Sequence, residues 1–404
     1  MLRDEPPADP GIWLLDPEID FLNHGSFGAC PREVLDYQIE LRNRMERQPV
    51  QLLVRELEGE LDAARAVLAE FLGAEMEGLV FVPNATSGVN TVLRSLEPEL
   101  RADAGCELLV TDQEYNACRN ALEVTARRTG ARVVVADLPF PCSGPDEVVA
   151  ALMEKVSDRT RLVLIDHVTS QSGMVLPVRE IVASLNERGI ESLIDGAHAP
   201  GMVALELRNL GATYYTGNCH KWLCSPKVAG FLYVPDRARR EVIRPLVISH
   251  GANAPLAGRS RFEVEFSWTG TTDPSPYLCV PKSLEVMGRL LPGGWPELMA
   301  ANRSLALEAR EILAGALGID APCPDGMIGS LATLPLPDSD PDAEPPTIML
   351  YVDPLQDLIL EKYHIELPIF PWPEFPQRVL RISAQAYNSS PQYVRLALAL
   401  KELL

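Results

Sequence analysis

One lysine of this chain lies among aromatic and apolar residues, where its amine is able to act as a nucleophile. Lys221 stands between His220 and Trp222, shortly after the strand-like residues 213–217. Partial burial lowers the pKa of an amine and prepares it for Schiff-base chemistry. The chain has only six lysines, and those other than Lys221 and Lys227 fall on amphipathic or terminal helical patterns. We therefore predict a catalytic lysine here, the alternative being a side chain that extends into solvent from a strand end.

Two further motifs have residue types that bind charged groups. Asp195 ends the apolar run 191–195, and a protonated ring nitrogen is one partner that suits a carboxylate buried there. A turn or helix-cap aspartate is the alternative. The segment NATSGVN (84–90) follows a strand and begins a helix. Its free N–H groups and the hydroxyls of Thr86 and Ser87 could hold a phosphate, although an ordinary helix cap has the same pattern.

The three motifs together match the needs of one cofactor, pyridoxal 5'-phosphate. Its ring nitrogen requires a carboxylate, its aldehyde a lysine and its phosphate a helix N-terminus. No GxGxxG or GK[ST] motif is present, which argues against the alternative of a nicotinamide-dependent oxidoreductase. The spacing of Cys219, His220 and Cys224 does not match a zinc ribbon, so no metal site is predicted.

Alternating strand and helix patterns must position these motifs. Strand-like apolar runs occupy 78–82, 106–112, 132–137, 160–166, 191–195, 213–217 and 230–234. Helical patterns between them begin near 86, 114, 145 and 177. Such units predict an α/β fold with a mostly parallel seven-stranded sheet, helices on both faces and an active site at the carboxyl ends of the strands.

The two ends of the chain differ from this central part. Amphipathic helical patterns cover 31–72, and the last third has an α+β pattern, with helices at 295–316, 354–363 and from 391, and strands at 347–352 and 379–383. We expect an N-terminal segment lining the active site (1–30), a large cofactor-binding domain (31–280) and a small α+β domain (281–404).

Composition limits the class of partner. The chain is 47% hydrophobic and 23% charged, which is typical of a globular protein, and its formal net charge is −20. This charge disfavours nucleic acid and anionic membrane surfaces. No apolar run approaches the roughly eighteen residues of a membrane span, and the first residues lack the apolar core of a signal peptide. We expect a cytoplasmic protein.

The motifs resemble those of the class V aminotransferase family of fold-type-I pyridoxal-phosphate enzymes, and most of all its isopenicillin N epimerase-like members. They occur in the expected order along nearly the whole chain. The segments that carry the resemblance are FLNHGSFGACP (21–31), NATSGVN (84–90), DQEYNACRN (112–120), DHVTSQSGMVLP (166–177), IDGAHAPG (194–201), GNCHKWLCSPKVAGFL (217–232), WTGTTDPSPYL (268–278) and RISAQAYN (381–388).

This resemblance implies roles around the cofactor ring. Lys221 forms the internal aldimine and moves the Cα proton, and Asp195 pairs with the pyridinium nitrogen. His198 lies near the phenolic oxygen O3′. Tyr115 replaces the family's stacking histidine over the ring, a position that suits an aromatic face. Ser170 stands where related desulfurases carry an asparagine that contacts O3′.

The resemblance also implies a phosphate site and a dimer. Thr86 and Ser87 hold the phosphate, with Asn218 and His220 completing the cradle, although the wider family has serine or threonine at the place of Asn218. Thr271 reaches the phosphate of the neighbouring subunit. The expected assembly is therefore a homodimer with active sites at the subunit interface.

For the substrate, the resemblance implies a carboxylate anchor and a pocket. Arg381 grips the α-carboxylate of an amino acid through its two-pronged guanidinium. Asn23, His24 and Gly25 line the substrate pocket. The alternatives for these residues are a surface ion pair for Arg381 and a structural role for His24.

Three reactions fit these residues once the Cα proton is removed: epimerisation, C–S β-elimination of a cysteine derivative, and transamination. The stretch 364–380 before Arg381 contains no cysteine, which argues against persulfide chemistry of the desulfurase type. Epimerisation requires an acid on the face opposite Lys221, for which His24, a tyrosine or a water are open choices. A non-catalytic binding protein on the same scaffold is the remaining alternative.

Overall fold

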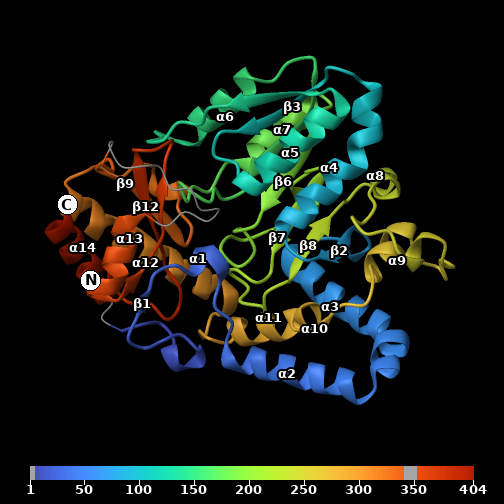
Figure 1. Cartoon of the computed structure of the whole chain (residues 1–404), viewed down its shortest axis with the longest axis horizontal. Coiled ribbons are helices and arrows are strands. Elements are labelled where there is room, and N and C mark those ends of the chain that lie inside the picture. Colours follow the sequence, from blue (N-terminus) through green and yellow to red (C-terminus); the bar gives the residue numbers. More distant parts are fainter. Residues whose placement is uncertain (1–4, 341–352) are drawn as a thin grey trace.

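A computed structural model describes residues 5–340 and 353–404, and its main element is a seven-stranded sheet (Figure 1). The strands are β2 (Leu79–Val82), β3 (Glu107–Thr111), β4 (Arg132–Ala136), β5 (Thr160–Asp166), β6 (Glu191–Gly196), β7 (Tyr214–Asn218) and β8 (Gly230–Tyr233). Their order is β2-β8-β7-β6-β5-β3-β4, with β8 antiparallel to both neighbours and the other pairs parallel. The predicted α/β class and mostly parallel seven-stranded sheet are confirmed.

Helices cover both faces of this sheet, as the continuous apolar strands predict. On one face, α4 (Ala85–Ala102) and α5 (Asn116–Thr129) pack on a core that contains Leu108 and Val110 of β3. On the other, α6 (Pro145–Glu154) and α7 (Val178–Glu187) pack on a core that contains Leu109 of the same strand. Because successive side chains of a strand point to opposite faces, one buried strand supplies both cores.

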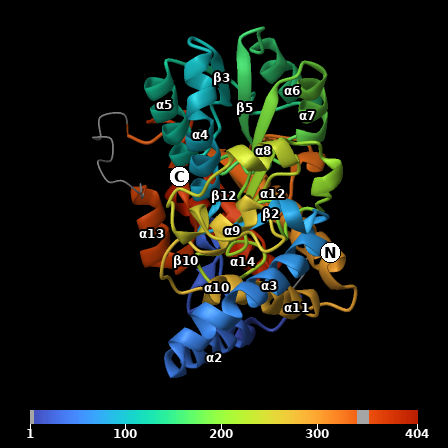
Figure 2. The same ribbon diagram turned by 90° about the vertical axis from the view of Figure 1, so that its right-hand side faces the viewer.

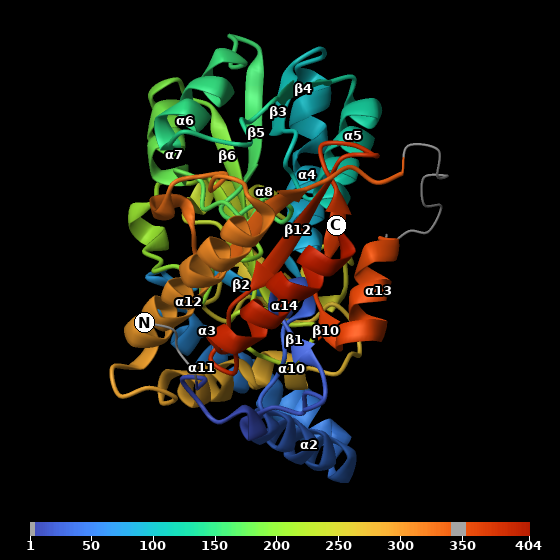
Figure 3. The same ribbon diagram turned by 90° about the vertical axis from the view of Figure 1, so that its left-hand side faces the viewer.

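The C-terminal part forms a smaller α+β unit, which Figure 3 shows from its own side. Its antiparallel sheet has the order β11-β12-β9, from β11 (Ile369–Pro371), β12 (Arg378–Ser383) and β9 (Leu331–Leu336). The helices α12 (Gly294–Leu317) and α14 (Ser390–Leu403) pack together. The helix α13 (Pro354–Tyr363) comes before β11 along the chain. The predicted strand at 347–352 lies outside the described residues.

The N-terminal residues dock on this smaller unit. β1 (Asp20–Phe21) pairs in parallel with β10 (Ile365–Glu366), and the amide of Ser383 donates to the carbonyl of Leu22 over 2.8 Å. The one-turn helix α1 (His24–Phe27) follows. The start of the chain is therefore held against β12, the strand that carries Arg381.

Several helices lie beyond the edge of the large sheet. They are α2 (Arg32–Arg47), α3 (Leu57–Leu72), α8 (Arg237–Val242), α9 (Arg261–Ser267), α10 (Ser275–Leu278) and α11 (Val280–Gly288), and Figure 2 shows α2 at the end of the molecule away from α5 and α6. The expected domain boundary after residue 280 falls at the start of α11, and the domain limits stay a prediction. Among the described residues, no helix is both long and apolar enough to cross a membrane.

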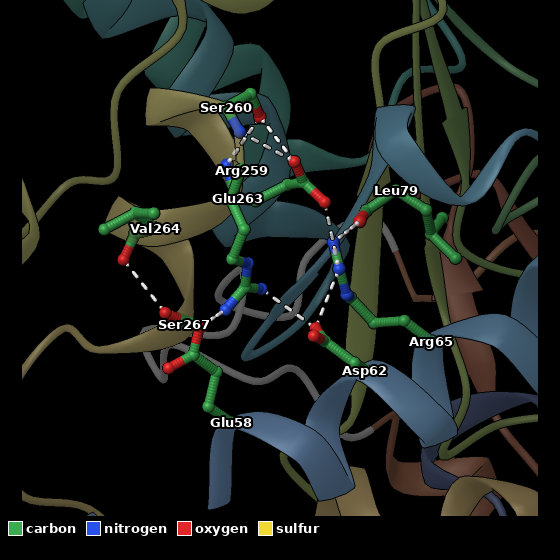
Figure 4. A network of polar contacts seen from close by, with 9 residues as sticks. All are labelled: Glu58, Asp62, Arg65, Leu79, Arg259, Ser260, Glu263, Val264 and Ser267. Carbon is green, nitrogen blue, oxygen red and sulfur yellow. Dashed lines mark hydrogen bonds and ion pairs between the residues drawn. The ribbon is translucent and has the colours of Figure 1, made fainter. Parts of the chain in front are cut away.

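A network of ion pairs ties α3 to α9, as Figure 4 shows. We call it the Arg65 network; its charged members are Glu58, Asp62, Arg65, Arg259 and Glu263. The guanidinium of Arg65 donates to the carbonyl of Leu79 at 2.9 Å, to Asp62 at 2.9 Å and to Glu263 at 3.2 Å. These contacts fix the helix that leads into the loop 268–274, where Thr271 lies.

Candidate active site

Lys221 lies in the loop that follows β7, at the carboxyl end of the central strands. Its Nζ is 2.9 Å from Nε2 of His198, which follows β6. Burial, and then the positive charge of Arg381, lower the pKa of Lys221 to about 8, although Asp195 and Asp166 oppose the shift. The lysine is thus largely ready to act as a neutral base or nucleophile near pH 8.

Asp195 ends β6 and is fully enclosed, with 1% of its surface exposed. Its Oδ1 accepts the amide of Ala197 at 2.9 Å, and its Oδ2 accepts the thiol of Cys118 at 3.1 Å. Burial raises the pKa of Asp195, while both hydrogen bonds and the charge of Lys221 reduce that rise. A cationic ring nitrogen at this carboxylate would compensate the remaining cost of burial.

Two further carboxyl groups, not predicted as site residues, lie beside Asp195. Asp166 is its direct neighbour across the β5–β6 ladder, and Glu114 follows β3; we call Glu114, Asp166 and Asp195 the acid cluster. Both carboxyl oxygens of Glu114, and Oδ2 of Asp166, lack a hydrogen-bond partner among the described residues. Burial, and then the neighbouring acids, raise the pKa of Glu114 well above its usual value, and the positive charge of Arg119 opposes this only in part.

The start of α4 is the place where the sequence predicts a phosphate cradle. Asn84 caps the helix by accepting the amide of Ser87 at 2.8 Å, and Asn218 at the end of β7 accepts the amide of Ala85 at 2.9 Å. A Cβ at Gly88 would overlap the hydroxyl of Thr216, so glycine lets the helix approach the sheet. Thr86 and Ser87 are half-buried in this first turn, where N–H groups and the helix dipole favour an anion.

His220 and Thr271 occupy the edges of this region. Nδ1 of His220 is 3.2 Å from the carbonyl of Ala229, and burial lowers the pKa of the ring to about 4. Its Nε2 is therefore a neutral hydrogen-bonding group. Thr271 is exposed, and the contact with a neighbouring subunit that the resemblance implies for it stays a prediction.

Arg381 on β12 is buried, with 1% exposed. One Nη donates to the carbonyl of Ser170 at 2.5 Å and the other to the hydroxyl of Ser26 at 3.0 Å, while the ring of Phe370 lies 5.1 Å from Cζ. Within the described chain, Nε of Arg381 has no hydrogen-bond partner. Burial lowers the pKa of Arg381 to about 10 because it disfavours the charged guanidinium. A carboxylate ligand would stabilise that charge again. Ser170 faces this arginine.

The N-terminal residues predicted to line the pocket close around Arg381. Gly25 donates its amide to Ser383 at 2.9 Å, and a Cβ there would come 2.7 Å from Leu331. Asn23 donates to Glu366 at 3.2 Å and is 8% exposed. His24 is fully buried, and its two ring nitrogens contact the hydroxyl of Tyr387 at 2.8 Å and the carbonyl of Lys221 at 3.0 Å.

Tyr115 stands at the start of α5 and is 40% exposed. Burial of the rest of the ring raises the pKa of its hydroxyl, as do Cys118 and Asp195, while Arg381 opposes the shift. The hydroxyl is therefore protonated at neutral pH. Tyr115 is thus within electrostatic range of both Asp195 and Arg381, the two ends of the site.

The side chains brought together here fit pyridoxal phosphate. Within the described residues, the structure offers an amine of lowered pKa, an acid cluster with carboxyl oxygens that lack hydrogen-bond partners, a helix N-terminus and an arginine whose Nε has no partner. The residues that sequence reasoning missed are Cys118, Glu114, Asp166 and Trp222. Their signal was spacing, since each lies within four positions of a predicted site residue or ends a predicted strand.

The sheet order, the lysine after β7 and the aspartate near the end of β6 are those of a fold-type-I pyridoxal-phosphate enzyme. Residues 29–255 match the family model described as "Aminotransferase class-V". The chain belongs to the class V aminotransferase family. This confirms the predicted enzyme class and cofactor.

Relatives with curated names differ in the reaction they are named for. The isopenicillin N epimerase of Amycolatopsis lactamdurans is 36% identical, and the match covers 96% of this chain and 96% of the epimerase. The isopenicillin N epimerase of Streptomyces clavuligerus is 34% identical, with 97% of each chain covered. A probable chloroplastic L-cysteine desulfhydrase of Arabidopsis thaliana is 31% identical over 96% of this chain and 84% of its own length. A solved cysteine desulfurase of Escherichia coli shares the fold, with a TM-score of 0.77, 20% identity and 96% of each chain covered.

Proposed function

We propose that this enzyme inverts the configuration at the Cα of an amino acid or an amino-acid-derived substrate, in the manner of an isopenicillin N epimerase. The observation that carries the proposal is the burial of Arg381, with its unpaired Nε, within electrostatic range of Lys221. An anchor for a carboxylate and a base are thereby held at one site. The bound cofactor withdraws electrons from Cα and so makes its proton removable.

Proton transfer on two faces requires a base and an acid. We assign the base to Lys221, whose pKa of about 8 leaves much of the amine neutral. We assign the acid of the opposite face to Tyr115, which is protonated and partly exposed. His24 is less suited, because both ring nitrogens are engaged and burial lowers its pKa to about 3.

The remaining site residues follow from their placement. Asp195 would hold the ring nitrogen and His198 the phenolic oxygen. The first turn of α4, with Asn218 and His220, would bind the phosphate. Ser170 and the N-terminal residues 23–26 would hold Arg381 in the orientation that receives the carboxylate.

A C–S lyase of a cysteine derivative is the second candidate, favoured by the 31% identity to a protein named as an L-cysteine desulfhydrase. Elimination requires only one base, so Tyr115 would be dispensable for it. The absence of cysteine from 364–380 argues against persulfide transfer by that stretch. Isopenicillin N and L-cysteine are therefore the first two substrates to compare.

The deciding experiment follows each substrate in deuterated water. Epimerisation predicts deuterium at Cα together with the inverted stereoisomer, whereas elimination predicts pyruvate and ammonia. Tyr115→Phe keeps the aromatic ring and removes the acid, so it should still exchange the Cα proton but lose inversion by about 100-fold or more. A Tyr115→Phe enzyme that inverts at the original rate would contradict the assignment.

A second measurement tests the lysine. Borohydride reduction of the loaded enzyme, digestion and mass spectrometry should locate the cofactor on Lys221. Lys221→Ala should lose both the label and the activity. A cofactor label on Lys227 instead would refute the proposed site while leaving the family intact.

The homodimer and the cytoplasmic location stay proposals. An interface is supported by a cavity of about 250 Å³ beside Ser87, lined by Val228, Leu246 and Thr272. Exposed apolar side chains surround it, since Val247 and Ile248 are 59% and 56% exposed. A second copy on this face would bring its Thr271 toward the phosphate cradle; sedimentation of the loaded enzyme tests this.

A further inference from the structure

A buried indole directs its only polar hydrogen at a histidine of the site. Trp222 is 1% exposed, and its Nε1 lies 3.3 Å from Nδ1 of His198. Indole nitrogen is a donor and never an acceptor. Nδ1 of His198 must therefore accept, which means that it carries no proton.

The other ring nitrogen of His198 then carries the proton. His198 is 2% exposed, and burial, followed by the positive charge of Lys221, lowers the pKa of the ring well below its usual value. A neutral imidazole has one N–H, and Trp222 leaves it only Nε2. That nitrogen lies 2.9 Å from Nζ of Lys221, so the ring N–H meets the lone pair of the amine once the lysine has lost its proton.

We propose that Trp222 is a positioning residue that fixes His198 in its Nε2–H tautomer, so that a hydrogen-bond donor faces Lys221 and the edge of the cofactor beside it. The tautomer itself follows from the contacts of this chain, and only the contact with the cofactor rests on the proposed function. In pyridoxal phosphate, the hydroxyl and aldehyde carbons are neighbours on the ring. A donor next to Nζ is therefore next to the phenolic oxygen.

The packing around Trp222 holds the indole in place. Its ring centroid lies 4.8 Å from that of His24. His24 is itself fixed by Tyr387 and by the carbonyl of Lys221. The opposite tautomer of His198 would set two N–H groups against each other and leave a buried donor without an acceptor, which is unfavourable.

The charged groups with the largest effect on His198 all disfavour an imidazolium at this position. They are Lys221, Arg381, His220 and His24, and each of them lowers the pKa of the ring. They come from the β7–β8 loop, β12 and α1. His198 thus remains neutral over the working range of the enzyme, and its tautomer is the property that Trp222 controls.

The test removes the indole N–H and keeps an aromatic ring. Trp222→Phe is the variant, and Trp295→Phe is its matched control, because Trp295 donates to the carbonyl of Leu284 at 3.0 Å elsewhere in the chain. Nitrogen-15 spectra of histidine-labelled protein, with and without cofactor, report the tautomer of His198, and His198→Ala assigns the signal. We expect Nε2–H in the wild type and in the control, and Nδ1–H or a mixture in Trp222→Phe.

A second readout uses the visible absorption of the bound cofactor. A donor at the phenolic oxygen stabilises its ionised form and lowers the pH midpoint of this absorption. Trp222→Phe should raise the midpoint by about one pH unit, and Trp295→Phe should not. A change in tautomer without a change in midpoint would refute the contact with the cofactor.

The spectrum of the wild type is decisive even if Trp222→Phe does not fold. Nδ1–H in the wild type would overturn the proposal, as would an unchanged tautomer in Trp222→Phe. If the tautomer changes as expected but borohydride places no cofactor on Lys221, the role of Trp222 stands and the proposed function fails. The two conclusions are therefore separable.

Discussion

The Arg65 network and the acid cluster both bury charged side chains, but only the first balances them within the chain. Around Arg65, cations and anions from α3 and α9 alternate (Figure 4), and the side chain of Arg65 is 5% exposed. Burial alone would raise the pKa of Glu263, yet hydrogen bonds from Ser260 and Arg65 outweigh it and lower that pKa. This is the usual pattern of a structural ion-pair cluster.

The acid cluster has the opposite pattern. Glu114, Asp166 and Asp195 are all acids, and Lys221, whose charge acts on Asp166 and Asp195, has a lowered pKa. A protein that leaves buried carboxyl oxygens without partners loses stability. The difference between the two regions indicates that the Arg65 network serves the fold, and it supports our proposal that the acid cluster receives a positively charged ligand, the ring nitrogen of the cofactor.

We expect the largest effect from a substitution that breaks the Arg65 network. Arg65→Met removes the cation shared by Asp62 and Glu263 and leaves the carbonyl of Leu79 without a donor. Breaking a buried pair on one side costs about 3 kcal/mol or more in the free energy of unfolding. Urea unfolding of the cofactor-free protein measures this, with Arg55→Met, an exposed arginine near the same helix, as the control. Equal stability of the two variants would contradict the structural role.

Much of this contrast was accessible from the sequence. Asp195 and Asp166 end predicted strands, and parallel neighbours align their carboxyl ends, so their approach follows from the strand pattern. Lys221 and the cap at Asn84 were predictable in the same way, because turn residues and apolar runs determine local structure.

Contacts between distant segments were not accessible. β9 includes Pro335, a residue type that argues against a central strand, and β9 is an edge strand, where a missing N–H is tolerated. The pairing of β1 with β10 joins residues far apart in sequence, and no local pattern encodes it. The hydrogen bond from Trp222 to His198 depends on the conformations of two side chains, which spacing does not specify.

The second prediction tests the acid cluster. Glu114→Gln keeps the shape of the side chain and removes an ionisable group that is neutral when folded. Since unfolding frees Glu114 to ionise, the wild type should lose stability as the pH rises above about 4.5, by up to about 1.4 kcal/mol per pH unit, until the raised folded pKa is reached. The variant should lack this slope.

Urea unfolding of the cofactor-free protein between pH 5 and 7 compares the two slopes. Glu123→Gln, on the more exposed side of α5, is the matched control and should keep the slope of the wild type. If Glu114→Gln is as pH-dependent as the wild type, Glu114 is ionised in the folded protein. The acid cluster would then have a counter-charge that the described contacts do not include.

The smallest effect is expected at the rim of the Arg65 network. Glu58 pairs with Arg259, but 65% of its side chain is exposed, whereas Asp62 also holds Arg259 at 2.9 Å. Because water and salt screen an exposed pair, Glu58→Gln should cost less than about 1 kcal/mol, and the cost should shrink in high salt. The same urea measurement at low and high ionic strength checks this. A loss as large as that of Arg65→Met, or one unaffected by salt, would mean that the rim and the centre of the network act as one cooperative unit.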